Sequence, residues 1–279
     1  MRHPAVAGQF YAGSQKALIK QIEDCYLHRL GPGKLPSLKK EKRKIVGLVS
    51  PHAGYMYSGP IAAHGFFRLA SEGTPESFVI IGPNHTGMGS GVSIVTSGEW
   101  ETPLGRIGID EKLASRIAKE SDIIDVDEEA HIYEHSIEVQ LPFIQHIFGS
   151  QIKFVPICMM FQDERTSLEV GEAIAKACSG SDVVVIASTD FTHYESQESA
   201  VRKDRMAIER ILKLDARGLL KCVEENNITM CGSGPVAAML IACEKMGAKN
   251  AELLKYATSG DVAGWMAEVV GYASIAILR

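Results

Sequence analysis

Apolar and polar positions follow two different periods along this chain. Short runs of β-branched and other apolar residues are typical of strands buried on both faces, and they lie at residues 45–50, 78–82, 92–96, 152–157, 182–188 and 271–278. Segments with the period of a helix lie between or beside these runs, at residues 14–29, 58–71, 110–120, 134–147, 164–179, 197–213, 215–225 and 233–246. This alternation predicts a three-layer α/β/α sandwich around a largely parallel, mixed sheet.

One segment departs from this alternation. Residues 97–109 combine turn residues with short apolar stretches, which predicts a hairpin or loop and some antiparallel pairing. No repeat, low-complexity tract or linker divides the chain, so we expect a single domain over residues 1–279.

Composition limits the classes of function. The chain has 279 residues, of which 46% are hydrophobic and 23% charged, which is typical of a compact globular protein. A net charge of −5 argues against a nucleic-acid partner, and the basic cluster at residues 39–44 is interpreted as a solvated loop before the first strand. No apolar run is long enough to span a membrane, and the first residues lack the apolar core of a signal peptide. We therefore expect a cytoplasmic protein with no membrane partner.

The six cysteines include no CxxC pair, and most fall within predicted helices or strands. This pattern predicts buried core thiols and no disulfide framework.

Reactive residues follow the predicted strands where these end. His52 follows the first strand, His85 follows the second, and Asp190 and His193 follow the strand at residues 182–188. Cys231 precedes the helix predicted at residues 233–246. Because ligands of open α/β sheets bind beyond the carboxyl ends of the strands, we expect these five residues to form one site.

These residue types favour a metal site. Two imidazoles and a thiolate, from His52, His85 and Cys231, would hold iron, copper or zinc and leave coordination positions open. His193, three residues after Asp190, is then interpreted as a general acid or base whose ring the carboxylate could orient. A metal-free alternative makes Cys231 the nucleophile of a hydrolase, because a helix N-terminus lowers the pKa of a thiol.

A second group of polar residues competes with the first. His131 and His135 are four residues apart, with Glu134 and Glu138 beside them, so a continuous helix would place both imidazoles on one face. The order of the residues is not that of the HExxH metalloprotease motif. Helix capping and surface polarity explain His131 equally well, whereas His135 and Glu138 are candidates for lining a pocket.

Six segments in this order resemble the Memo family: AGQFYAG, SPHAGYMYSG, GPNHTG, EHSIEVQLPF, STDFTHY and CGSGP. Eukaryotic members are known as mediators of ErbB2-driven cell motility, and archaeal and bacterial members are called AmmeMemoRadiSam system protein B. The resemblance extends from Ala7 to the final apolar run.

The resemblance implies a fold like that of the class III extradiol (LigB-type) dioxygenases. Those enzymes hold non-haem Fe(II) with two His and a Glu, and a further His acts as acid or base. In the Memo pattern His52 and His85 match the two His ligands, and Cys231 stands in the place of the carboxylate. Asp190 and His193 match the remaining pocket residues, with His193 at the acid/base position.

The same resemblance places Phe10 and Tyr57 in the pocket. Phe10 replaces a tryptophan of the eukaryotic members, so their recognition of phosphotyrosine peptides is not carried over. Dioxygenase activity is not carried over either, because a thiolate donates more charge than a carboxylate and is easily oxidised.

Two functions remain open. The first is a metal-dependent redox enzyme that uses iron or copper, with zinc as a third candidate and no nucleotide cofactor. The alternative is a non-catalytic metal- or peptide-binding module that works with an AMMECR1-type protein and a radical-SAM protein, as the prokaryotic family name implies. The chain has no CxxxCxxC motif, so it would be the partner of the radical enzyme, and its small-molecule or peptide ligand is unknown.

Overall fold

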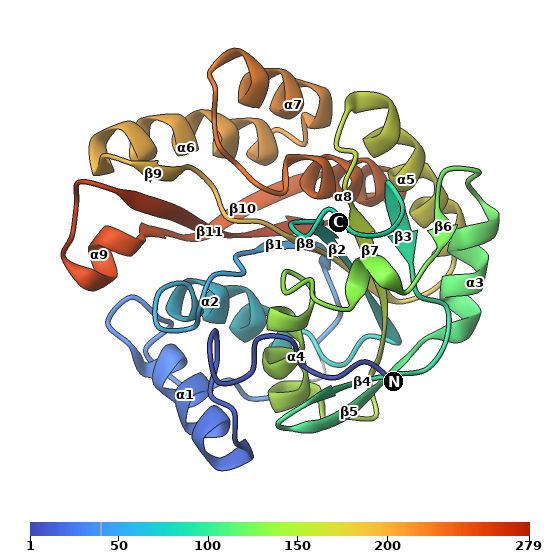
Figure 1. The fold of residues 1–279 in the computed structure, drawn as a ribbon, viewed down its shortest axis with the longest axis horizontal. Helices are drawn as coiled ribbons and strands as arrows, with labels where there is room; N and C mark the ends of the chain where they lie inside the picture. Colours follow the sequence, from blue (N-terminus) through green and yellow to red (C-terminus); the bar gives the residue numbers. More distant parts are fainter. Residues whose placement is uncertain (40) are drawn as a thin grey trace.

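The computed structural model describes residues 1–39 and 41–279, and its centre is a sheet of parallel strands (Figure 1). Four parallel strands lie side by side in the order β1 (Ile45–Ser50), β8 (Val183–Ser188), β2 (Ser77–Pro83) and β7 (Lys153–Met159). Because β8 lies between β1 and β2, the carboxyl ends of three strands meet at one edge of the sheet.

Antiparallel strands extend this centre on both sides. β11 (Val269–Leu278) pairs with β1, and β10 (Asn250–Thr258) pairs with β11. On the other side β3 (Val92–Ile94) pairs with β7, and β6 (Asp125–Val126) pairs with β3.

The expected hairpin is present at residues 97–109. It consists of β4 (Glu99–Thr102) and β5 (Gly105–Ile109), which are antiparallel to each other, and β5 pairs with the start of β7. The prediction of a hairpin or loop with antiparallel pairing is therefore confirmed.

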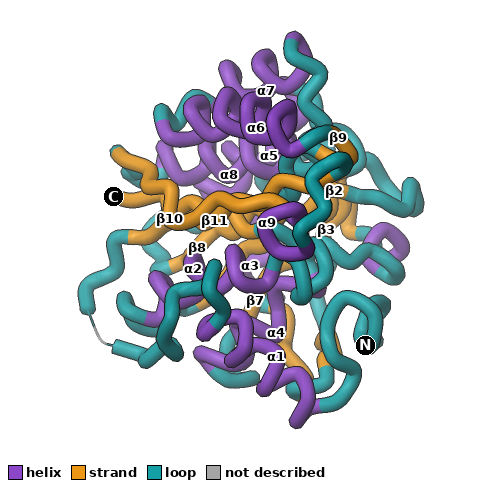
Figure 2. Tube along the Cα trace, turned by 90° about the vertical axis from the view of Figure 1, so that its left-hand side faces the viewer, coloured by secondary structure: helices purple, strands orange, loops and turns teal. Residues whose placement is uncertain are grey.

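Helices cover both faces of the sheet (Figure 2). One layer contains α5 (Glu164–Ala177), α6 (Gln197–Leu212), α7 (Ala216–Glu225) and α8 (Ser233–Lys245). The other contains α1 (Gln15–Leu27), α2 (Gly59–Ala70) and α4 (Leu141–Phe148), while α3 (Glu111–Lys119) packs beside α5. This arrangement confirms the predicted α/β/α sandwich. Within the described part of the chain, no helix combines the length and apolar character needed to cross a bilayer.

Four elements differ from the sequence prediction. The helix expected at residues 134–147 begins as an α-helix only at Leu141, after a single 3₁₀ turn at Glu138–Gln140. Pro142 sets this boundary, because proline fits only the first turn of a helix. The strand β10 was not predicted, because its exposed face carries charged residues such as Glu252 and breaks the apolar run. The short β9 (His193–Glu195) and α9 (Ser259–Ala263) were also missed.

The basic cluster at residues 39–44 includes Lys40, which lies outside the described residues. Arg43 of this cluster bonds to Asp182 and to the carbonyl of Gly73, so it is part of the packed structure rather than of a solvated loop.

Close packing of α5 against α8 yields the first prediction. A Cβ added to Gly171 would lie 2.6 Å from the Ala238 carbonyl oxygen and 2.8 Å from the Ile241 Cβ. Gly171→Ala should therefore lower the free energy of unfolding by about 1–3 kcal/mol, although alanine is the better helix former. Chemical denaturation measures this change.

Gly108→Ala is the matched control. Gly108 has no neighbour within 4 Å of the added Cβ, so this variant should keep or slightly raise the stability. A Gly171→Ala protein as stable as the Gly108→Ala protein would contradict the packing argument.

Candidate metal centre

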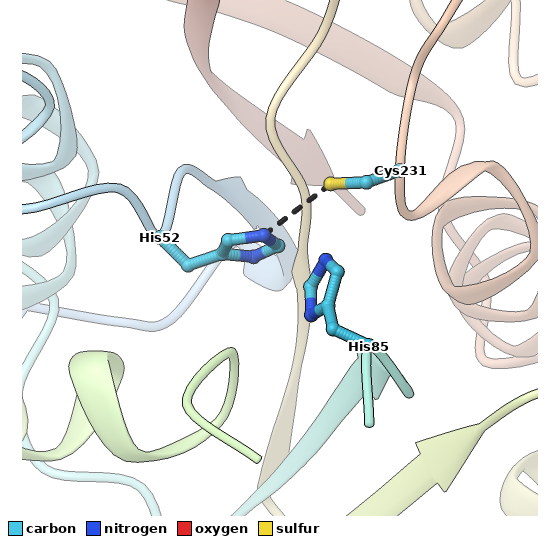
Figure 3. Close-up of side chains that lie close together, drawn as sticks. All are labelled: His52, His85 and Cys231. Atoms are coloured by element: carbon cyan, nitrogen blue, oxygen red, sulfur yellow. Dashed lines mark hydrogen bonds between the residues drawn. The ribbon is translucent and has the colours of Figure 1, made fainter. Parts of the chain in front are cut away.

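Three potential metal ligands converge beyond the carboxyl ends of the strands (Figure 3). His52 follows β1, His85 follows β2, and Cys231 precedes α8. Their ligand atoms all lie within 4.8 Å of one another, and Cys231 Sγ is 3.3 Å from His52 Nε2. The three residues predicted as metal ligands are thus brought together in one cluster.

The position of the proton on the His52 ring follows from its neighbours. The Ser188 hydroxyl donates to the carbonyl oxygen of Ser136 at 2.7 Å and accepts from the Gln140 amide at 2.8 Å. Because its single proton is used on a carbonyl that can only accept, its 2.9 Å contact with His52 Nδ1 must be donated by the ring. His52 Nε2 therefore keeps its lone pair, which faces Cys231.

Burial reinforces this assignment. His52 is 2% exposed, and burial together with the neighbouring imidazoles of His135 and His85 holds its pKa well below the usual value. A neutral imidazole with a free Nε2 is the form that binds a metal ion.

His85 is held by a carboxylate. Its Nδ1 lies 2.9 Å from Glu134 Oε1, and its backbone N–H donates to Glu134 Oε2 at 2.6 Å. Burial raises the pKa of Glu134, but hydrogen bonds from His85 outweigh it and hold the pKa at about 2. Glu134 is therefore ionised and accepts the Nδ1 proton. Burial lowers the pKa of His85, but the hydrogen bond and the charge of Glu134 outweigh it and raise this pKa above its usual value. The neutral ring has Nε2 free, as in carboxylate–histidine–metal arrangements.

Cys231 is buried in a way that opposes ionisation. Burial, followed by the negative charge of Asp190, raises the pKa of its thiol. This raised pKa does not favour the metal-free alternative, in which the helix N-terminus makes the Cys231 thiol a nucleophile. The backbone N–H of Asp190 donates to the sulfur at 3.2 Å, so the site can support a thiolate once a cation lies beside it.

The donor set fits a transition-metal ion. Two atoms bound tetrahedrally to one ion, at bond lengths of about 2.0–2.3 Å, lie about 3.3–3.6 Å apart, which matches the contact between Cys231 and His52. His85, Glu134 and His135 form a second group with ligand atoms within 4.8 Å. Glu134 in that group already accepts four hydrogen bonds, from the backbone N–H groups of residues 85, 135 and 136 and from the His85 ring. Among the described residues, His52, His85 and Cys231 are therefore the better candidate site for an ion.

A cavity of about 600 Å³ lies in front of this cluster. Its walls include His52 and His85 and all five of the other residues predicted for the site: Phe10, Tyr57, His135, Asp190 and His193. Cys231 is not among the lining residues.

Thr229 orients the ring of His193. The Nδ1 of His193 lies 2.8 Å from the Thr229 carbonyl oxygen, which can only accept, so the proton is on Nδ1 and Nε2 is free. Asp190 instead accepts the backbone N–H of His52 at 2.9 Å, and burial raises its pKa to about 6. The carboxylate therefore organises the ligand loop, and the sequence-based idea that it orients His193 is not what the structure shows.

The competing group of residues divides between two places. The His135 ring stacks on His85 at 4.7 Å and contacts the Phe10 ring at 4.8 Å, so both residues shape the cavity floor. His131 is only 1% exposed and packs against Trp100, so the interpretation as surface polarity was wrong. Glu138 lies outside the cavity and binds the N-terminal segment.

Comparison with known proteins agrees with the motifs. A family model described as Memo-like protein matches residues 2–276. The chain belongs to the Memo family. A MEMO1 family protein of Methanopyrus kandleri is 52% identical over 280 residues, which cover 100% of this chain and 99% of that relative. One from Methanothermobacter thermautotrophicus is 53% identical over 277 residues, covering 99% of both chains.

A solved structure supports the fold alone. The crystal structure of an uncharacterized Escherichia coli protein matches this Memo-family chain with a TM-score of 0.56 and 13% identity. The match covers 84% of this chain and 100% of that one.

Sequence reasoning missed the residues that hold the imidazoles of this Memo-family protein. Ser188 is the last residue of β8 and the first of the STDFTHY motif, and Glu134 begins the EHSIEVQLPF motif, so their positions beside reactive residues were the available signal. Thr229 acts through its backbone carbonyl, for which side-chain chemistry gives no signal. The cavity wall at residues 259–268 was missed because it follows the unpredicted strand β10.

Glu134 yields the second prediction. Glu134→Gln removes the charge that holds the His85 ring, so metal affinity should fall about 10- to 100-fold. Competition with a chromophoric chelator, using Co(II) as the probe, measures the affinity. Glu129→Gln is the control, because Glu129 is exposed on a neighbouring turn. Equal affinities in the two variants would show that Glu134 does not position His85.

Proposed function

We propose that this Memo-family protein binds one iron or copper ion through His52, His85 and Cys231 and is a metal-dependent redox enzyme acting on a small molecule. The observation that carries the proposal is the shared state of three imidazoles, from His52, His85 and His193. Each is held through Nδ1, so that Nε2 remains free. Two of these nitrogens meet the Cys231 sulfur, and the third lies at the cavity wall beside them.

The residues have distinct roles in this proposal. The bound ion would supply one-electron chemistry and polarise a coordinated oxygen. His193 Nε2 takes or gives a proton at the substrate, while Thr229 keeps the ring in one tautomer. Asp190 fixes the backbone of His52 and donates its own N–H to the Cys231 sulfur. Phe10 and Tyr57 exclude water from the cavity.

A second candidate is a non-catalytic metal- or peptide-binding module that acts with an AMMECR1-type protein and a radical-SAM protein. The exposed aromatic residues at the cavity, Tyr194 and Trp265, favour it because they offer a surface for a larger ligand. A hydrolase centred on Cys231 loses support, because burial raises the pKa of its thiol and Cys231 is not among the residues that line the cavity.

Metal content tests the ligand assignment. Anaerobically purified wild type should bind Fe(II) or Cu(I) in about equimolar amount. His52→Ala should abolish binding, and Cys231→Ser should lower the affinity by at least about tenfold, because a thiolate is lost. His3→Ala, at an exposed imidazole, should bind as wild type does. Equimolar binding by His52→Ala would overturn the assignment.

His193→Ala separates catalysis from binding. The variant should keep the metal content of wild type, because His193 is not a ligand, but lose about 10²- to 10⁴-fold in turnover. Oxygen uptake with ascorbate as the electron donor provides the measurement. Wild-type protein that binds the ion but consumes no oxygen with any candidate substrate would favour the binding module instead.

A further inference from the structure

The cavity in front of the metal cluster has an unusual balance of charge. Its described walls contain two carboxylates, from Asp190 and Glu268, and neither lysine nor arginine. Four imidazoles also line it, and two of them, His85 and His135, already face the carboxylate of Glu134. The walls therefore offer no fixed positive side chain to an anionic ligand.

Glu268 is placed to meet a ligand. It lies on the exposed segment that leads into β11, and it has no ion pair or hydrogen bond among the described residues. A carboxylate on a cavity wall without a partner attracts a cation, and salt screens this attraction because Glu268 is exposed.

Aromatic rings make up much of the remaining wall. Trp265 is 66% exposed and Tyr194 is 75% exposed, and both line the cavity with Phe10, Tyr57 and Tyr272. Tyr194 has a φ of 58°, a left-handed conformation that is costly for a bulky side chain. Ring faces stack on flat ligands and attract organic cations.

The Tyr272 phenol stays neutral. Burial, then the charge of Asp190 and the nearby phenols of Tyr57 and Tyr194, raise the pKa of Tyr272. Its hydroxyl can donate a hydrogen bond, and it adds no negative charge.

We propose that the cavity binds a small aromatic amine, with its ring between Trp265 and the tyrosines, its ammonium group at Glu268 and its other end toward the metal cluster. A volume of about 600 Å³ accommodates a ligand of this size. The proposal concerns the same cavity as the proposed function. It rests on that function for the statement that a metal ion lies at the inner end of the cavity. The charge preference of the wall, in contrast, is independent of the metal.

The test compares two ligands that differ in the charge of one end group. Tyramine carries an ammonium and 4-hydroxyphenylacetate a carboxylate, and both carry the same phenol. Isothermal titration calorimetry on the full chain, freed of metal with a chelator, measures both. Of the two tryptophans, Trp100 is 2% exposed, so quenching of fluorescence reports on Trp265 as a second readout.

Wild-type protein should bind tyramine at least roughly tenfold more tightly than 4-hydroxyphenylacetate. Glu268→Gln should remove most of this preference, because the shape is kept and the charge is lost. Glu252→Gln, at an exposed position of β10 outside the cavity, should retain it.

Three results would overturn the proposal: equal or tighter binding of the carboxylate, an unchanged preference in Glu268→Gln, or no binding of either ligand at millimolar concentration. Because the protein is metal-free in this experiment, its result is distinct from that of the metal analysis. A protein that binds tyramine but no metal ion would refute the proposed function and keep this inference. A protein that binds the ion but not tyramine would refute this inference and keep the proposed function.

Discussion

The site depends on where the imidazole protons lie. The partners of His52, His85 and His193 on the Nδ1 side are a hydroxyl whose proton is used elsewhere, a carboxylate and a carbonyl. All three can only accept, so each ring donates from Nδ1, and each ring in its neutral form presents an unprotonated Nε2. A shift of the His52 or His85 proton to Nε2 would turn a ligand into a donor, and the cluster would lose its affinity for a cation. The same shift at His193 would turn a base into a donor.

One segment, at residues 134–140, supplies most of this control. Glu134 holds His85, while the Ser136 carbonyl and the Gln140 amide fix the Ser188 hydroxyl that holds His52. Glu138, in the same segment, is fully buried and accepts hydrogen bonds from Arg2, from the Tyr11 hydroxyl and from the N–H groups of residues 5 and 6. The N-terminal segment that carries Phe10 is thereby fixed to the segment that orients the metal ligands.

The sequence predicted where the reactive residues lie better than it predicted which residues hydrogen-bond to them. Apolar strands and the rule for their carboxyl ends were enough to group His52, His85 and Cys231, because both features are local patterns. The support from Glu134 was hidden by a helical period that Pro142 interrupts, and Thr229 contributes a backbone atom. The edge strand β10 forms because it pairs with β11, although its own sequence is only weakly typical of a strand. The cavity wall at residues 259–268 follows β10, so it was missed together with the strand.

X-ray absorption on the metal-loaded protein, with Zn(II) or Co(II) as the probe, tests the central claim most directly. The account predicts one sulfur neighbour at about 2.3 Å and two imidazole nitrogens at about 2.0–2.1 Å, with the sulfur lost in Cys231→Ser. A shell of nitrogen and oxygen alone in the wild type would place the ion elsewhere, for example at His85, Glu134 and His135, and would contradict the account.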